Sequence, residues 1–173
     1  MLRLETPRLI LRPPRLDDAP AIEAIAGRRE VAEMTASVPH PYPPGGAAQF
    51  ISGLAQPSAE GVDYHVSIER RADGQVIGMA ALYPGPAAPS GQIGYYIAPE
   101  VWGRGYATEA AGRLLRYALD NLRLPRITAH VFLGNAASLR VLEKLGFTRL
   151  GEIERDLPLR GGLRRIHLLE HRG

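Results

Sequence analysis

The chain has 173 residues, 45% of them hydrophobic, and a net charge of +3, which is typical of one folded domain that buries a core of its own. Because cysteine is absent, disulfides, thiolate catalysis and cysteine-ligated zinc are excluded. The small net charge does not favour nucleic acid as a partner, and no run reaches the roughly 18 apolar residues of a membrane-spanning helix, so no membrane partner is expected.

The first dozen residues lack the apolar run and the cleavage site of a signal peptide. We therefore expect a cytoplasmic protein. Lys144 is the only lysine, so the positive charge comes almost wholly from arginine. The guanidinium group suits phosphate, although arginines spread over a solvated surface explain the composition equally well.

The first half of the chain predicts strands, short helices and a hairpin. Apolar residues recur at helical spacing from Ala19 to Ala26, and Asp17 or Asp18 would cap that helix. Asp73-Gly74 between two alternating runs predicts a hairpin turn. Residues 39–46 and 83–91 are rich in proline and glycine and are expected to be loops. In chain order we expect a strand at 9–12, a helix from about 17, a short helix at 47–55 and strands at 63–70, 75–82 and 93–97.

The second half contains the clearest element, a long helix that starts near Ala107. Its apolar positions keep helical spacing up to Leu122, and Pro125 stops it. A strand at 127–132, a helix at 136–145 closed by Gly146, and a last pair of strands from Phe147 to about residue 171 follow. This order predicts an α/β (α+β) fold, with one domain over residues 1–173. We expect a mixed, mostly antiparallel central sheet of six to seven strands and about four helices.

A glycine-rich turn, Gly-Arg-Gly-Tyr-Ala-Thr at 103–108, lies between a predicted strand and the long helix. Unpaired N–H groups converge at a helix start, where the helix dipole favours negative charge, so the position suits a pyrophosphate. Gly103 and Gly105 would let phosphate oxygens approach the backbone closely. Thr108 would either add a hydroxyl donor or cap the helix.

Three alternative roles for this turn compete with a pyrophosphate site. A Walker loop requires a Gly-Lys-Ser/Thr ending, which is missing here. A dinucleotide fingerprint requires a third glycine where Thr108 stands, and it would come early in the chain. A turn that binds no ligand is the third alternative, and these residues alone do not exclude it.

Three blocks of the sequence resemble the GNAT superfamily of acyl-CoA N-acyltransferases. The block IGYYIAPEVWGRGYATEA at 93–110 resembles the family's coenzyme-binding segment, although Trp102 replaces the usual Gln or Arg. NAASLRVLEKLGF at 135–147 and ETPRLILRPPRLDDA at 5–19 resemble the ribosomal-protein Nα-acetyltransferase branch, which also carries the tryptophan. The blocks occur in the expected order and cover nearly the whole chain.

The resemblance implies an acetyl-CoA site and assigns residues to it. The pantetheine arm would enter a splayed gap between the strands that end at 97 and 132, and it would pair with an open strand edge as another strand does. The backbone near Ile97, Ala98 and Pro99 would bind this arm. The pyrophosphate would be held by Gly103, Arg104, Gly105, Tyr106, Ala107 and Thr108, with Arg104 either contributing charge or remaining a surface residue.

The helix at 136–145 contributes the candidate catalytic residue. Asn135 would either cap this helix or contact the coenzyme. Ser138 would either satisfy backbone groups of the first turn or donate a proton to the departing thiolate, as the branch resemblance suggests. Many family members place a tyrosine seven residues after the asparagine for that task, and Leu142 stands there instead.

No general base can be assigned from the sequence. Tyr95 and Tyr96 alternate along a strand, so only one of them can face the gap, and a packing role is expected for both. Glu109 is expected to support the helix start electrostatically. The histidines are scattered without metal-ligand spacing, so no metal is expected. Candidates for the base on the final strands are Glu152, Glu154, Asp156 and His167.

The resulting hypothesis is direct transfer of an acetyl group from acetyl-CoA to a primary amine, with no acyl-enzyme. A backbone N–H of Ile97 or Ala98 would stabilise the oxyanion. The acceptor is either a protein N-terminus or a small molecule such as an antibiotic or polyamine, and loops at 39–46 and 157–163 would shape its pocket. The protein would be a monomer or homodimer. A non-catalytic acyl-CoA sensor and, more remotely, a nucleotide-binding enzyme are the alternatives.

Overall fold

The computed structural model describes residues 2–54, 63–85 and 89–173. Eight strands form one sheet in the order β1-β2-β3-β4-β5-β6-β8-β7, and every neighbouring pair is antiparallel except β5 and β6. The strands are β1 (Leu4–Glu5), β2 (Leu9–Arg12), β3 (Tyr64–Arg70), β4 (Val76–Pro84), β5 (Ser90–Ile97), β6 (Arg126–Phe132), β7 (Thr148–Leu157) and β8 (Gly162–Arg172).

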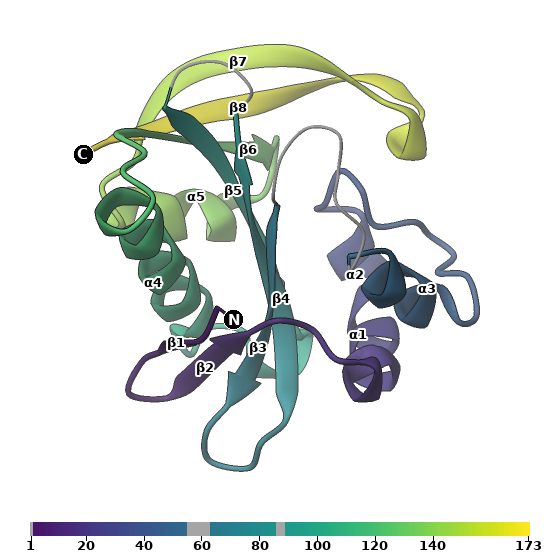
Figure 1. The fold of residues 1–173 in the computed structure, drawn as a ribbon. Helices are drawn as coiled ribbons and strands as arrows, with labels where there is room; N and C mark the ends of the chain where they lie inside the picture. Colours follow the sequence, from purple (N-terminus) through teal and green to yellow (C-terminus); the bar gives the residue numbers. More distant parts are fainter. Residues whose placement is uncertain (1, 55–62, 86–88) are drawn as a thin grey trace.

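Helices cover both faces of the sheet (Figure 1). α4 and α5 lie on one face, and α1, α2 and α3 lie on the other. None of the helices in the described part of the chain is long and apolar enough to cross a membrane. Their bounds are α1 (Ala19–Ala26), α2 (Arg29–Ala32), α3 (Gly46–Gly53), α4 (Tyr106–Asp120) and α5 (Ala136–Lys144), with 3-10 turns at Leu16–Asp18, Pro99–Val101 and Pro158–Arg160.

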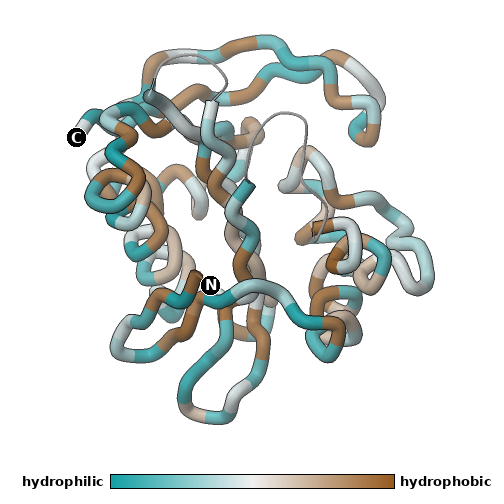
Figure 2. The backbone as a smooth tube through the Cα atoms, viewed as in Figure 1, coloured by the Kyte–Doolittle hydropathy of each residue, from teal (hydrophilic) through white to brown (hydrophobic). Residues whose placement is uncertain are grey.

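The apolar face predicted for the long helix forms the centre of the larger core. Ala110, Ala111, Leu114 and Ala118 of α4 are fully buried and pack with the sheet residues that face this helix. Figure 2 shows hydrophobic segments along the central strands and on the helices that flank them. The binary pattern therefore positions α4, and with it the glycine-rich turn at its start, against the middle of the sheet.

The parallel contact between β5 and β6 is short. It consists of the pairs Ser90–Arg126, Gly91–Ile127 and Gln92–Thr128. Beyond these pairs β5 continues beside β4 as far as Ile97, and β6 continues beside β8 as far as Phe132. The two strands therefore separate over their carboxyl-terminal halves, which confirms the predicted splay.

The sequence-based expectations need four corrections. The described residues form eight strands and five helices, because the two-residue β1 and the one-turn α2 carry too short a pattern to be recognised. The predicted loop at 83–91 is shorter, since β4 extends to Pro84 and β5 begins at Ser90. The helix expected at 47–55 spans Gly46–Gly53, and residue 55 lies outside the described residues. Neither Asp17 nor Asp18 caps α1 through its side chain.

Asp18 instead belongs to a buried ionic cluster. Its carboxylate accepts hydrogen bonds from both terminal nitrogens of Arg12 at 2.8 and 2.9 Å, and from the Ser67 hydroxyl at 2.9 Å. Arg12 also donates to Glu69 at 2.6 Å. Burial alone would raise the pKa of Asp18, but hydrogen bonds from Arg12, the Arg15 amide and Ser67 lower it below its ordinary value. The cluster joins β2, β3 and the start of α1.

Asp18→Asn should destabilise the protein by about 3 kcal/mol, because it leaves a buried guanidinium short of its charge partner. Urea unfolding at pH 7 measures this loss. Glu33→Gln, which breaks the exposed Arg29–Glu33 pair, is the control and should leave the unfolding midpoint unchanged. Equal midpoints for the two variants would contradict the structural role of the cluster.

Candidate active site

The turn before α4 depends on two glycines in the left-handed region. Gly103 has φ 72° and Gly105 has φ 80°, a conformation that is costly for residues with a Cβ. Gly105 occupies the N-cap position of α4, where no side chain caps the helix. Thr108 lies inside the first turn, so of the two roles expected for it the helix cap is wrong, and the hydroxyl donor stays a prediction.

The first backbone amides of α4 have no acceptor within the helix. The first intrahelical bond runs from Glu109 N to Gly105 O at 3.0 Å, so the N–H groups of Tyr106, Ala107 and Thr108 precede it. A helix start with free N–H groups and no capping side chain favours an anion. This geometry fits a pyrophosphate.

Thr6 and Arg8 of the N-terminal segment hold this helix start through Glu109 of α4. We call these three residues the Arg8 clamp. Glu109 accepts hydrogen bonds from the Thr6 hydroxyl at 2.6 Å and from the Arg8 amide and guanidinium at 3.0 and 2.6 Å. Arg8 also donates to the Arg104 carbonyl at 2.9 Å and lies 4.4 Å from the centre of the Tyr106 ring. Burial would raise the pKa of Glu109, but the hydrogen bonds from Thr6 and Arg8 lower it overall. Glu109 therefore anchors the helix start to the N-terminal segment through partners that the sequence did not reveal. Its electrostatic support of the helix stays a prediction.

The backbone at the end of β5 distinguishes the two oxyanion candidates. The Ala98 amide donates to the Ile77 carbonyl at 2.8 Å, so it is already used. Because successive residues of a strand direct their amides to opposite edges, the Ile97 amide is directed to the edge from which β6 has separated. The Ile97 carbonyl accepts from the Trp102 indole at 2.7 Å. Pro99 has no amide hydrogen and opens the 3-10 turn that leads to the glycines.

Gly78 in β4 is a residue that the sequence analysis missed. A Cβ on Gly78 would lie 2.2 Å from the Tyr96 carbonyl oxygen and 3.0 Å from Ile97 Cα. Only glycine therefore allows the end of β5 near Ile97, five residues beyond the last pair with β6, to lie this close to β4. The available signal was a glycine inside a predicted strand, which often marks a close backbone approach.

α5 begins beside the open part of β5. The Asn135 side chain caps α5 by accepting from the Ser138 amide at 3.2 Å, as one of the two sequence hypotheses expected. The Ser138 hydroxyl lies 2.9 Å from the Tyr95 hydroxyl. Tyr96 lies on the other face, where it packs near Met79. Leu142, the position at which the resemblance expects a tyrosine, is 1% exposed and belongs to the core.

The four acidic and histidine candidates for the base lie on the hairpin of β7 and β8. Glu152 is opposite His167 in the pairing and forms an ion pair of 2.5 Å with Arg165. Glu154 and Asp156 are exposed. Among the described residues, none of these four side chains forms a hydrogen bond with Ser138. The structure therefore favours none of them as the base.

His130 was also missed. It lies on β6 two residues beyond the last pair with β5, and its Nδ1 is 2.8 Å from the Arg155 guanidinium. Since arginine only donates, Nδ1 accepts and the neutral ring carries its proton on Nε2. Burial, helped by the charge of Arg155, lowers the pKa of His130 to about 4. At neutral pH this side chain is therefore a hydrogen-bond donor at the edge of the splay.

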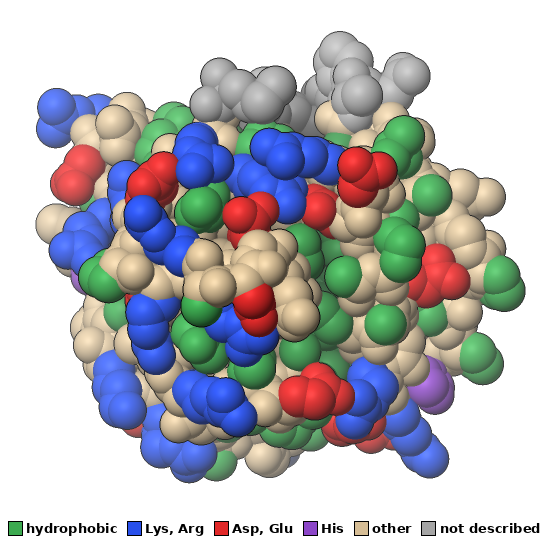
Figure 3. Space-filling view, turned by 90° about the horizontal axis from the view of Figure 1, so that it is seen from below, with side chains coloured by type: hydrophobic (Ala, Val, Ile, Leu, Met, Phe, Trp, Pro, Cys, Tyr) green, Lys and Arg blue, Asp and Glu red, His purple; other side chains and the backbone are tan. Residues whose placement is uncertain are grey.

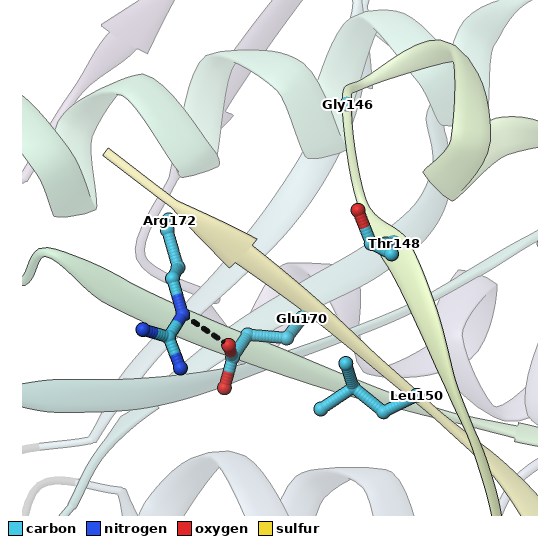
Figure 4. Close-up of a pocket in the computed structure, with 5 residues that line it drawn as sticks. All are labelled: Gly146, Thr148, Leu150, Glu170 and Arg172. Atoms are coloured by element: carbon cyan, nitrogen blue, oxygen red, sulfur yellow. Dashed lines mark hydrogen bonds and ion pairs between the residues drawn. The ribbon is translucent and has the colours of Figure 1, made fainter.

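Two pockets lie outside the splay. Gly146, Thr148, Leu150, Glu170 and Arg172 line the first, in which Arg172 forms an ion pair with Glu170 at 2.5 Å (Figure 4). The second lies beside α1 and includes Ala98 and Arg104 in its lining.

The lower face of the molecule carries many Arg side chains with acidic ones among them (Figure 3). Within the described ranges no group of three or more His, Asp or Glu residues is arranged to hold a metal ion.

The His130 imidazole should titrate near pH 4, which NMR of its ring protons measures. Because the folded pKa lies below the ordinary value of about 6.5, the unfolded chain binds more protons between these two pH values. Stability from this residue is present above pH 6.5 and is lost as the pH falls toward 4. Arg155→Gln should raise the pKa by removing the repelling charge. A midpoint near 6.5 in the unaltered protein would contradict this arrangement.

Known proteins resemble this chain in sequence and in fold. Residues 8–148 match the family model described as Acetyltransferase (GNAT) domain. The uncharacterized N-acetyltransferase YoaA of Bacillus subtilis (strain 168) is 34% identical over 164 residues, which cover 91% of this chain and 89% of that protein. The structure of Mycobacterium smegmatis RimJ in complex with CoA-disulfide has a TM-score of 0.84 at 27% identity, covering 99% of this chain and 86% of that one.

A further solved structure has the same fold. The ribosomal-protein-S5-alanine acetyltransferase of Vibrio fischeri has a TM-score of 0.82 at 20% identity, covering 99% of this chain and 97% of that one. Together with the family match, the relatives identify an acyltransferase that uses acetyl-CoA. The chain belongs to the GNAT family of N-acetyltransferases.

Proposed function

We propose that the protein acetylates a primary amine by direct attack on acetyl-CoA in a ternary complex, with the α-amine of a protein N-terminus as the first acceptor to test. The observation that carries the proposal is the start of α4, where three free amides follow Gly105 beside the splay of β5 and β6. The pyrophosphate binds at residues 103–108, and the pantetheine arm lies along residues 97–99. Asn135 contacts the coenzyme with the part of its carboxamide that does not cap α5.

Support for an N-terminal acceptor comes from relatives and from amine chemistry. The name of the Vibrio fischeri neighbour assigns it to an alanine of a ribosomal protein. An α-amine has a pKa near 8, against about 10.4 for lysine, so a useful fraction is neutral at physiological pH. Bound water suffices to remove its proton after attack. A chain without a recognisable base therefore suits an α-amine better than a lysine or a polyamine.

In the proposed reaction, binding orients the two substrates and the protein stabilises the charge that develops. The neutral amine attacks the thioester carbonyl carbon, and the Ile97 amide donates to the oxyanion. The carbon–sulfur bond then breaks, and Ser138 donates the proton that converts the thiolate to free CoA. The amine releases its own proton to solvent.

Gly105→Glu should weaken acetyl-CoA binding by about 100-fold or more, since it strains a left-handed position and adds negative charge beside the phosphates. Isothermal titration calorimetry measures the affinity. Gly45→Glu is the matched control, because Gly45 is also an N-cap glycine, with φ 74° and nothing within 4 Å of its Cβ position, at the start of α3. Unchanged affinity in Gly105→Glu would remove the coenzyme assignment.

Purified protein with acetyl-CoA should release CoA in the presence of peptides with free N-termini, and more slowly with polyamines or aminoglycosides. Mass spectrometry with labelled acetyl-CoA should find the label on the amine and none on the protein. Coenzyme binding without CoA release for any amine would favour a sensor, and a labelled protein would contradict direct attack. A preference for a small amine would replace the N-terminal acceptor but leave the transfer chemistry intact.

A further inference from the structure

The Tyr95 and Ser138 side chains form a pair of hydroxyls that connects β5 to α5. The distance between the two oxygens is 2.9 Å, and the pair is partly buried. Tyr95 lies three residues beyond Gln92, the last residue of β5 that pairs with β6. The pair therefore lies where the two strands have separated, on the face of the sheet that α5 covers.

Both members of the pair are held in place. Ser138 is in the first turn of α5, and its amide donates to the Asn135 carboxamide at 3.2 Å. The ring of Tyr95 packs against the larger core. A phenylalanine would fill the same volume, so the core alone does not require the hydroxyl. Within the described residues, Ser138 supplies the partners of this hydroxyl, its own hydroxyl at 2.9 Å and its carbonyl oxygen at 3.5 Å.

The two hydroxyls differ in acidity. An aliphatic hydroxyl is a far weaker acid than a phenol, whose ordinary pKa is near 10, and a thiol has a pKa near 8.5. Serine alone is therefore poorly suited to protonate a thiolate. Burial raises the pKa of Tyr95 to about 12, above that of a thiol, so the phenol stays protonated throughout the neutral range and assists Ser138 as a hydrogen-bond donor.

We propose that Tyr95 is a positioning residue for proton delivery, and that it donates its hydrogen bond to Ser138 while Ser138 faces the leaving sulfur. This inference rests on the proposed function. As the carbon–sulfur bond breaks, the Ser138 proton moves to sulfur and the Tyr95 proton moves toward the Ser138 oxygen. Solvent returns a proton to Tyr95 after CoA leaves, and the amine has released one proton to solvent, so protons balance over the cycle.

The test measures kcat and the KM for acetyl-CoA in Tyr95→Phe, Ser138→Ala and the double variant. Tyr95→Phe should lower kcat by about 10- to 100-fold, within or below the usual range for general acid catalysis, and should change the KM for acetyl-CoA less than threefold. Because the two hydroxyls act as a unit, the double variant should be no slower than the slower single variant. Tyr117→Phe, which removes the hydroxyl of a tyrosine on α4 whose ring contacts Tyr64 of β3, should keep the wild-type kcat.

A second pair of variants keeps the test decisive if Tyr95→Phe folds poorly. Ser138→Thr retains the hydroxyl and should keep most of kcat, whereas Ser138→Val has the same shape as the threonine variant without the hydroxyl and should lose it. Three results would overturn the proposal. They are a loss of kcat in the double variant that equals the product of the two single losses, a wild-type kcat in Tyr95→Phe, and equal rates for the threonine and valine variants. Failure of the proposed function is distinct, since wild-type protein would then release no CoA with any amine.

Discussion

The arrangement of the candidate active site depends on how the first turn of α4 is held. A left-handed N-cap glycine leaves the amides of this turn without a capping side chain, so something else must fix the direction of the helix. The Arg8 clamp fixes the direction of the helix, because the Glu109 carboxylate accepts three hydrogen bonds from the N-terminal segment. Glu109 thereby anchors the helix to the N-terminal segment and leaves the first amides of the helix without a capping group, as an anion site requires.

The sheet provides the second requirement, which is an open edge beside that helix start. Gly78 lets β5 stay paired with β4 after β6 has separated from β5. The Trp102 indole donates to the Ile97 carbonyl and so connects the end of β5 to the glycine-rich turn. As a result, the strand edge, the turn and the start of α5 meet in one region. Each contributes a different kind of group: backbone amides from β5 and α4, and hydroxyls from Tyr95 and Ser138.

Elements with a local pattern were predictable from the sequence. The apolar spacing of α4, the glycines of the turn, the Asn135 cap and the Asp73-Gly74 hairpin all depend on residues a few positions apart, and all were recognised. The paired side chains were not predictable, because their partners are distant in sequence. Tyr95 and Ser138 are 43 positions apart, and Arg8 and Glu109 are 101 apart. Asp18 shows a different difficulty. Its position suggested a helix cap, but Arg12 of β2, only six residues earlier, and Ser67 of β3 donate to the same carboxylate.

The short ladder between β5 and β6 has a consequence for how this scaffold can change. In the described sheet, three residue pairs join these strands, and their remaining halves share no backbone pairing. The width of the opening is therefore set by the volume of the side chains that pack around it, rather than by fixed peptide geometry. Substitutions of smaller for larger residues there would widen the opening without breaking a main-chain hydrogen bond. Under the proposed function, such changes would let donor selectivity drift while the fold stays the same.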